Sequence, residues 1–214
     1  MSTTSFASAT LDRREVVAQL IQRVPNVLAV AGLGSSTYDL FAAGDRDRNF
    51  YLWGAMGGAT MIGLGLALAQ PQESVVVLTG DGEQLMGLGA LATVGAQQPP
   101  NLTIVVLDNG HFGETGMQQS HTHLGTDLTA VAKACSIANA FRVQEASGLD
   151  AVVQAIQSRQ GPSLAQILVK ADDLPRALPS RDGVYIKTAC GVPWDCPRSE
   201  LPRIASLSCR VLHR

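Results

Sequence analysis

The sequence predicts an α/β fold in which a doubly wound, mostly parallel sheet is flanked by helices. Segments 75–79 and 102–107 are apolar except for one threonine each and are of strand length, and they alternate with segments whose apolar residues recur at helical spacing. Such alternation is typical of a parallel sheet with both faces covered. A chain of 214 residues, 46% of them hydrophobic, is long enough to bury one core. We find no internal repeat and no low-complexity run.

The first half of the chain begins with Leu11, Val16, Val17, Leu20 and Ile21 at helical spacing, and Thr10 or Asp12 can cap this helix. A buried strand then runs into a glycine- and serine-rich loop at 32–36. The elements expected up to residue 69 are a helix at 10–23, a strand at 27–31, a helix ending near 41, a short strand at 50–53 and a glycine-rich helix at 57–69.

The second half continues the alternation, and the run Pro99-Pro100-Asn101 stops a long helix. Its expected elements are a strand at 75–79, a helix at 82–97, a strand at 102–107, a polar loop at 108–126, a helix at 128–140, a strand at 141–144, a helix at 149–158 and a strand at 163–169. We therefore divide the chain into an N-terminal helix (1–26), a main domain (27–171) and an irregular C-terminal arm (172–214).

Composition excludes several function classes. A charged fraction of 16% and a net charge of −2 offer no basic stripe for nucleic acid and no polybasic membrane patch. The most apolar stretch, 54–69, is short for a membrane span and holds five glycines, so a buried helix is expected there. The first 17 residues lack the apolar region of a secretory signal, and a cytoplasmic protein is expected.

The four cysteines form no CxxC pair, and reduced thiols are the expectation. Cys190, Cys196, Cys209 and His213 have spacings loosely like those of a zinc site, which the long first gap disfavours.

Two polar motifs follow the apolar strands at 75–79 and 102–107. Gly80-Asp81-Gly82 comes after the first, and Asp108-Asn109-Gly110 comes after the second. Ligands gather at the carboxyl ends of the strands of such sheets, and Mg²⁺ prefers oxygen ligands. Either motif alone is an ordinary turn former, whereas the pair is specific. The Asp81 carboxylate, the Asn109 side-chain oxygen and a loop carbonyl near His111 therefore predict a Mg²⁺–diphosphate site. No G-x-G-x-x-G follows a strand, which disfavours a nicotinamide fold.

With these motifs in place, residues of about 27–187 resemble the diphosphate-binding (PP) domain of thiamine diphosphate (ThDP) enzymes, that is, the PP module of the ThDP-binding fold. The likeness is to the small β chains of sulfopyruvate decarboxylases and to the C-terminal halves of phosphonopyruvate decarboxylases. The residues that carry it are Gly54-Ala55-Met56-Gly57, Gly80-Asp81-Gly82, Leu107-Asp108-Asn109-Gly110, Gly113-Glu114-Thr115-Gly116 and Pro179-Ser180-Arg181-Asp182-Gly183-Val184-Tyr185.

The resemblance also implies roles for individual residues. Asp81, Asn109 and the carbonyl of His111 match metal ligands, and Met56 matches the residue that wedges between the two cofactor rings. Residues expected to act in catalysis are Met56, Glu114 and His121. The positions expected to bind the cofactor are Gly34, Ser35, Ser36, Gly54, Met56, Gly80, Gly82, Glu83, Phe112 and Gly113.

The function implied by the resemblance is the ThDP- and Mg²⁺-dependent decarboxylation of a small 2-oxo acid. The chain has no room for the pyrimidine-binding (PYR) domain, whose glutamate activates the cofactor ring. It is therefore expected to be a β subunit that is inactive without a PYR-type α subunit, in an assembly such as α2β2 or larger. Alternatives are a subunit of an acetolactate-synthase-like carboligase and a non-catalytic ThDP-binding subunit. A 2-oxo-acid ferredoxin oxidoreductase chain is disfavoured by the absence of CxxC.

Overall fold

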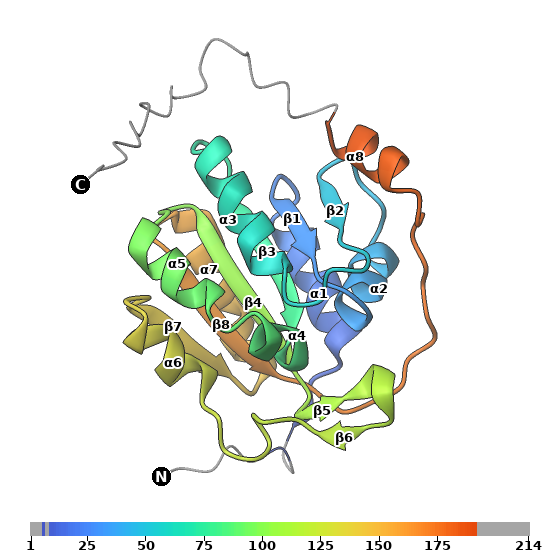
Figure 1. Ribbon diagram of the computed structural model, residues 1–214, viewed down its shortest axis with the longest axis vertical. Helices are drawn as coiled ribbons and strands as arrows, with labels where there is room; N and C mark the ends of the chain where they lie inside the picture. Colours follow the sequence, from blue (N-terminus) through green and yellow to red (C-terminus); the bar gives the residue numbers. More distant parts are fainter. Residues whose placement is uncertain (1–5, 7–8, 192–214) are drawn as a thin grey trace, which may run out of the picture.

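The computed structural model describes residue 6 and residues 9–191, and its centre is one six-stranded parallel sheet (Figure 1). The strand order is β2-β1-β3-β4-β8-β7, and every neighbouring pair is parallel. The predicted fold class is confirmed. The strands are β1 (Leu28–Ala31), β2 (Asn49–Tyr51), β3 (Val75–Gly80), β4 (Leu102–Asp108), β7 (Asn139–Val143) and β8 (Ser163–Leu168).

Helices cover both faces of the sheet, because successive side chains of each strand point to opposite faces. In β1, Ala29 and Ala31 pack in one apolar cluster with α1 (Arg13–Arg23) and α7 (Leu149–Ser158). Leu28 and Val30 pack in a second cluster with α3 (Ala59–Ala69), α5 (Ala90–Gln97) and α6 (Leu128–Ala134). The helices flanking the sheet are α1 (Arg13–Arg23), α2 (Ser35–Ala42), α3 (Ala59–Ala69), α4 (Asp81–Met86), α5 (Ala90–Gln97), α6 (Leu128–Ala134) and α7 (Leu149–Ser158). No helix among the described residues is long and apolar enough to cross a membrane.

The predicted helix at 82–97 is wrong in one respect, since it is broken into α4 and α5 at Gly87–Gly89. A β-carbon on residue 87 would lie 2.2 Å from the carbonyl oxygen of Gly57. The backbone of the loop before α3 thus packs directly against this turn, and tertiary contact overrides the helical pattern of the apolar residues.

The predicted loop at 108–126 contains a small hairpin. Its strands β5 (His111–Phe112) and β6 (Gln118–Gln119) flank a short 3-10 turn at Gly113–Thr115. Helix α6 ends at Ala134, earlier than predicted, because the chain turns through Ser136 at positive φ before β7. This hairpin lies at the carboxyl ends of the central strands, which is the end of the sheet where ligands bind in such folds (Figure 1).

Beyond β8 the chain runs along the outside of the molecule to helix α8 (Gly183–Gly191), which packs against β2 (Figure 1). No regular element is predicted in this arm from the sequence, and α8 is an addition. The arm is fastened at several points: Arg14 Nη2 donates to the Pro175 carbonyl at 2.7 Å, and the indole N–H of Trp53 donates to the Ser180 carbonyl at 3.0 Å. Cys196, Cys209 and His213 lie outside the described residues.

Candidate functional site

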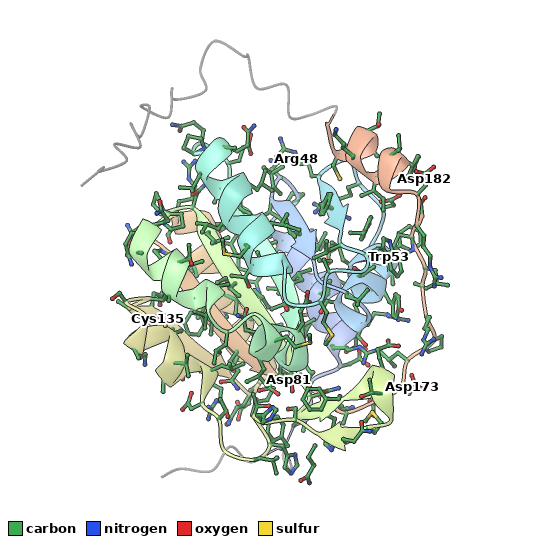
Figure 2. All side chains as sticks on the ribbon, in the orientation of Figure 1. Arg48, Trp53, Asp81, Cys135, Asp173 and Asp182 are labelled. Carbon is green, nitrogen blue, oxygen red and sulfur yellow. The ribbon has the colours of Figure 1, made fainter. Side chains whose placement is uncertain are left out.

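A cavity of about 160 Å³ opens where the carboxyl ends of β1, β3 and β4 meet the β5–β6 hairpin. Most of its lining comes from the start of α2, the loop before α3, the start of α4 and the hairpin, and α1, the end of β4 and the residue after β8 add the rest. Figure 2 labels Asp81 at this end of the sheet. The residues that line the cavity are Arg13, Leu33, Gly34, Ser35, Ser36, Met56, Gly80, Asp81, Gly82, Glu83, Leu107, Asn109, His111, Phe112, Gly113, Glu114, Thr115 and Val169.

The parallel register of β3 and β4 brings the two polar motifs together. Gly80 pairs with Leu107, so Asp81 and Asp108 leave the sheet at the same level. Asp81 is only 2% exposed, and its Oδ2 accepts hydrogen bonds from the hydroxyls of Ser120 and Thr122. Burial, and next the nearby charge of Asp108, raise the pKa of Asp81 to about 7. The fold therefore holds a buried carboxylate that forms no salt bridge with any of the residues described by the structure.

Asp108 has a different role from Asp81 although the two are close in space. Its carboxylate accepts from Gln166 Nε2 at 2.6 Å, from Thr122 Oγ1 at 2.9 Å and from the backbone N–H of Gly110 at 2.9 Å. The side chain is fully buried and does not line the cavity. Asp108 thus anchors the loop and fixes Thr122, which in turn orients the Asp81 carboxylate.

Asn109 and His111 form a tight turn at the edge of the cavity. Asn109 Oδ1 accepts from the backbone N–H of His111 at 2.9 Å, and His111 Nδ1 lies 2.8 Å from the Asn109 carbonyl. An Asx turn of this kind holds the amide oxygen in one orientation. No three His, Cys, Asp or Glu side chains in the described part of the chain are placed to hold a metal ion.

Glu83 lines the cavity, but its carboxylate is occupied within the protein. It is 3% exposed, accepts from Thr79 Oγ1 at 2.9 Å and from the Gly57 N–H at 3.3 Å, and also bonds the backbone of Leu33 and Ala59. Burial raises the pKa of Glu83 above its usual value. The side chain therefore ties the loop after β1 to the loop before α3. The sequence interpretation gave Glu83 only as a cofactor-binding position and did not include this structural role.

Met56 lies at the mouth of the cavity, over the start of α4. A β-carbon added to Gly82 would lie 2.8 Å from Phe112 Cδ1 and 3.9 Å from Met56 Cε. The side chain of Met56 remains 44% exposed. Glycine at position 82 therefore lets the backbone lie between these two side chains, and Met56 is available to contact a molecule that enters the cavity.

The structure gathers most of the residues predicted for the site, with two exceptions. Gly54 and His121 do not line the cavity. Gly54 has a φ of +74° in the same loop as Met56, and the exposed His121 ring packs edge-on against Phe112 with centroids 5.9 Å apart. The cavity lining also includes Leu107 and Thr115, which belong to the motifs noted in the sequence, and Arg13, Leu33 and Val169, which the sequence interpretation missed; of these, Arg13 brings charge. No sequence signal marks Arg13, because it belongs to the first turn of an amphipathic helix.

Comparison with known protein families gives a match to the part of the chain that contains this cavity. The family described as "Thiamine pyrophosphate enzyme, C-terminal TPP binding domain" matches residues 33–167, more than half of the chain. The chain belongs to this family. The part matched to the TPP-binding domain family runs from the loop after β1 to β8 and contains the cavity loops that follow β1, β3 and β4. The resemblance inferred from the sequence is thereby confirmed.

Within the TPP-binding domain family, two curated relatives are similar over long segments. A protein named sulfopyruvate decarboxylase subunit beta, from Methanocaldococcus jannaschii, is 40% identical over 126 residues, which cover 58% of this chain and 66% of that one. A protein named phosphonopyruvate decarboxylase, from Streptomyces viridochromogenes, is 40% identical over 157 residues, covering 73% and 39%. The chain thus matches under two-thirds of each of these relatives.

The crystal structure of benzoylformate decarboxylase from Polynucleobacter necessarius superposes with a TM-score of 0.64 at 20% identity. The superposed region covers 82% of this chain and 36% of the benzoylformate decarboxylase chain. At this identity the likeness establishes the fold of the ThDP-dependent enzymes.

Proposed function

We propose that this chain is the PP-domain (β) subunit of a two-subunit, ThDP- and Mg²⁺-dependent decarboxylase of small 2-oxo acids with an anionic tail, such as sulfopyruvate or phosphonopyruvate. The observation that carries the proposal is the cavity itself. In it, Asp81 and Asn109 follow two paired strands, and the cavity lies within the segment that matches a TPP-binding domain. Relatives with about 40% identity that bear these decarboxylase names support the reaction class.

The residues of the cavity fit a magnesium ion with a diphosphate. Asp81 is a buried carboxylate that forms no salt bridge within the described part of the chain. Burying an unpaired charge is costly, and a divalent cation would compensate it. Asp81, Asn109 and the His111 carbonyl would be its protein ligands. The first backbone N–H groups of α2, which follow Gly34 at a φ of +79°, favour the negative charge of a diphosphate.

When bound, ThDP supplies the carbon nucleophile for the ketone of the 2-oxo acid and accepts the electrons left by departing CO₂. The protein's own residues would position and protect this chemistry. Met56 would separate the cofactor's two rings, and the apolar sides of Phe112 and Leu107 would exclude water. Glu114 lines the cavity and His121 lies on the adjoining hairpin, so either side chain could hold or release a proton at the substrate.

The cavity opens to solvent in the isolated chain, and its lining residue Met56 is exposed, as are Met86 at the end of α4 and Met117 in the β5–β6 hairpin. We propose that a PYR-domain α subunit covers this opening and supplies the glutamate that activates the cofactor ring. An assembly such as α2β2 or larger follows from the symmetry of paired sites. The name "subunit beta" of the archaeal relative supports a partner chain.

The experiment is to purify the chain alone and together with a candidate PYR-domain chain, each with ThDP and Mg²⁺. We expect CO₂ release from sulfopyruvate or phosphonopyruvate in the reconstituted complex only. Turnover by the chain alone would refute the two-subunit architecture. Binding of ThDP with no turnover in any complex would instead favour a non-catalytic ThDP-binding subunit.

Product analysis separates decarboxylation from carboligation. A free aldehyde is expected from the proposed reaction, whereas a new carbon–carbon bond would identify an acetolactate-synthase-like carboligase.

A further inference from the structure

Arg13 is a buried cation at the floor of the cavity, and the sequence interpretation did not include it. It is the first residue of α1 and is 7% exposed. Two of its nitrogens are engaged: Nε donates to Asp39 Oδ2 at 2.8 Å, and Nη1 donates to the Asp172 carbonyl at 3.0 Å. These bonds hold the guanidinium rigidly in place. Nη2 has no hydrogen-bond partner among the described residues.

In the described part of the chain, the fully enclosed polar atoms without a hydrogen-bond partner do not include Nη2 of Arg13, so this atom has some accessible surface. Because Arg13 lines the cavity and is otherwise buried, the accessible side of this nitrogen is expected to face the cavity. A guanidinium whose other donors are already satisfied presents its remaining N–H groups in a fixed orientation, which suits the oxygens of an acid group.

The charges around the cavity make this nitrogen significant. Of the cavity-lining residues, which all lie in the described part of the chain, Arg13 is the one arginine or lysine, whereas Asp81, Glu83 and Glu114 are acidic. An oxyanion entering this space needs a compensating cation beyond the metal. The Asp39 carboxylate is shared between Arg13 and Arg14, since Arg14 Nε also donates to Asp39, at 3.1 Å. Two guanidiniums thus share one carboxylate.

The position of Arg13 points to one part of the cavity. Asp39, its carboxylate partner, lies one turn inside α2, whose first residues Ser35 and Ser36 line the same cavity. The guanidinium therefore lies beside the N-terminus of α2, where free backbone N–H groups already favour negative charge. A helix terminus and a fixed guanidinium together form a stronger oxyanion site than either alone.

We infer that Arg13 binds an oxyanion of the molecule held in the cavity, through Nη2 and alongside the N-terminus of α2. The inference rests on the proposed function. The oxyanion is a phosphoryl group of the cofactor or the sulfonate, phosphonate or carboxylate of the substrate. All of these groups would bind a guanidinium in the same way. Measuring the affinity for the cofactor and the KM for the substrate distinguishes a cofactor oxyanion from a substrate oxyanion.

Arg14 provides a matched control. Like Arg13 it pairs with Asp39 and donates to a carbonyl of the C-terminal arm, that of Pro175, but it does not line the cavity. Arg13→Gln and Arg14→Gln therefore remove the same charge and the same kinds of structural contact. Arg13 is the more buried of the two, so a loss of ligand binding counts as a cavity effect when Arg13→Lys, which restores the charge, regains part of it.

The test measures binding of inorganic pyrophosphate and of ThDP, each with Mg²⁺, to the full chain by titration calorimetry at several salt concentrations. It also measures KM and kcat for the 2-oxo acid in the reconstituted enzyme. If the oxyanion belongs to the cofactor, Arg13→Gln weakens both bound ligands by about tenfold or more, as expected for one charged hydrogen bond, and reduces the salt dependence of the affinity. If it belongs to the substrate, those affinities are kept and KM rises by about tenfold or more. Arg13→Lys restores part of the loss in either case.

Equal effects of Arg13→Gln and Arg14→Gln in every measurement would overturn the inference and reduce Arg13 to a structural residue. If the unmodified chain and its complex bind neither ThDP nor pyrophosphate, the proposed function itself is wrong and the inference fails with it. The two failures are therefore distinguishable by the behaviour of the unmodified protein.

Discussion

The carboxylate of Glu83 occupies the space that any side chain at position 32 would need. A β-carbon on Gly32 would lie 1.6 Å from Glu83 Oε2. Glycine at 32 and glutamate at 83 are therefore one structural unit, in which the loop after β1 comes close enough to be held by the buried carboxylate.

Gly32→Ala is expected to lower the free energy of unfolding by about 1–3 kcal/mol, because the new methyl group forces Glu83 out of its hydrogen bonds. Denaturant unfolding measures the change. Gly65→Ala is the control, since Gly65 lies in the middle of α3 with open space where its β-carbon would be. That substitution should raise stability by up to about 1 kcal/mol. Equal effects at the two positions would contradict the close packing of Gly32 and Glu83.

Glu83→Gln is expected to loosen the loops that Glu83 holds. The amide turns an N–H donor toward donors that now bond a carboxylate, and each buried group left unpaired costs about 1–3 kcal/mol. Hydrogen exchange should show faster exchange at the amides of Leu33, Gly57 and Ala59. Glu73→Gln is the control, because Glu73 is half-exposed and pairs with Arg48 far from the cavity. Unchanged exchange at the three amides in Glu83→Gln would argue against the tie.

Asp81→Asn tests the magnesium site without any turnover. In chelator the variant should be at least as stable as the unmodified chain, because a buried carboxylate without a cation is replaced by a neutral amide of the same shape. The rise in Tm caused by Mg²⁺ with ThDP should be lost, since Asn is a poorer ligand. Thermal unfolding with and without these ligands provides the measurement. Asp150→Asn, at an exposed position, should keep the full rise. A rise retained by Asp81→Asn would remove Asp81 from the site.

Cys190 should react slowly with thiol reagents. Its side chain is buried against β2, its thiol donates to the Asn49 carbonyl, and burial raises its pKa to about 11. The thiolate is the reactive form, so at pH 8 only about one thiol in a thousand is ionised there. Alkylation followed by peptide mapping should show Cys135 modified before Cys190, because Cys135 is only half-buried. The Cys190 rate should keep rising up to about pH 11, and a plateau below pH 9 would show that helix α8 does not bury it.

The strands and the main helices could be predicted because their signals are local. The apolar run at 102–107 is buried on both faces as β4, and Asp12 caps α1 by accepting from the N–H groups of Arg14 and Glu15. The break between α4 and α5 could not be predicted, since it depends on contact with Gly57, distant in sequence. The same holds for the site. Asp81 and Asn109 could be predicted because each belongs to a motif that directly follows a strand. Arg13 could not, because it lies in an ordinary amphipathic helix, and the structural role of Glu83 could not, because its hydrogen-bond donors lie in other loops.

The register between β3 and β4 has a consequence for variation among related chains. Asp81 and Asn109 are separated along the chain by α4, α5 and the whole of β4, yet their relative height depends only on which residues of β3 and β4 pair. Insertions or deletions around residues 98–101, at the opposite end of the strands, would change the number of residues between Asp81 and Asn109 without moving either side chain. Comparison by residue interval alone would then overlook such relatives, whereas alignment of the two strand ends would find them.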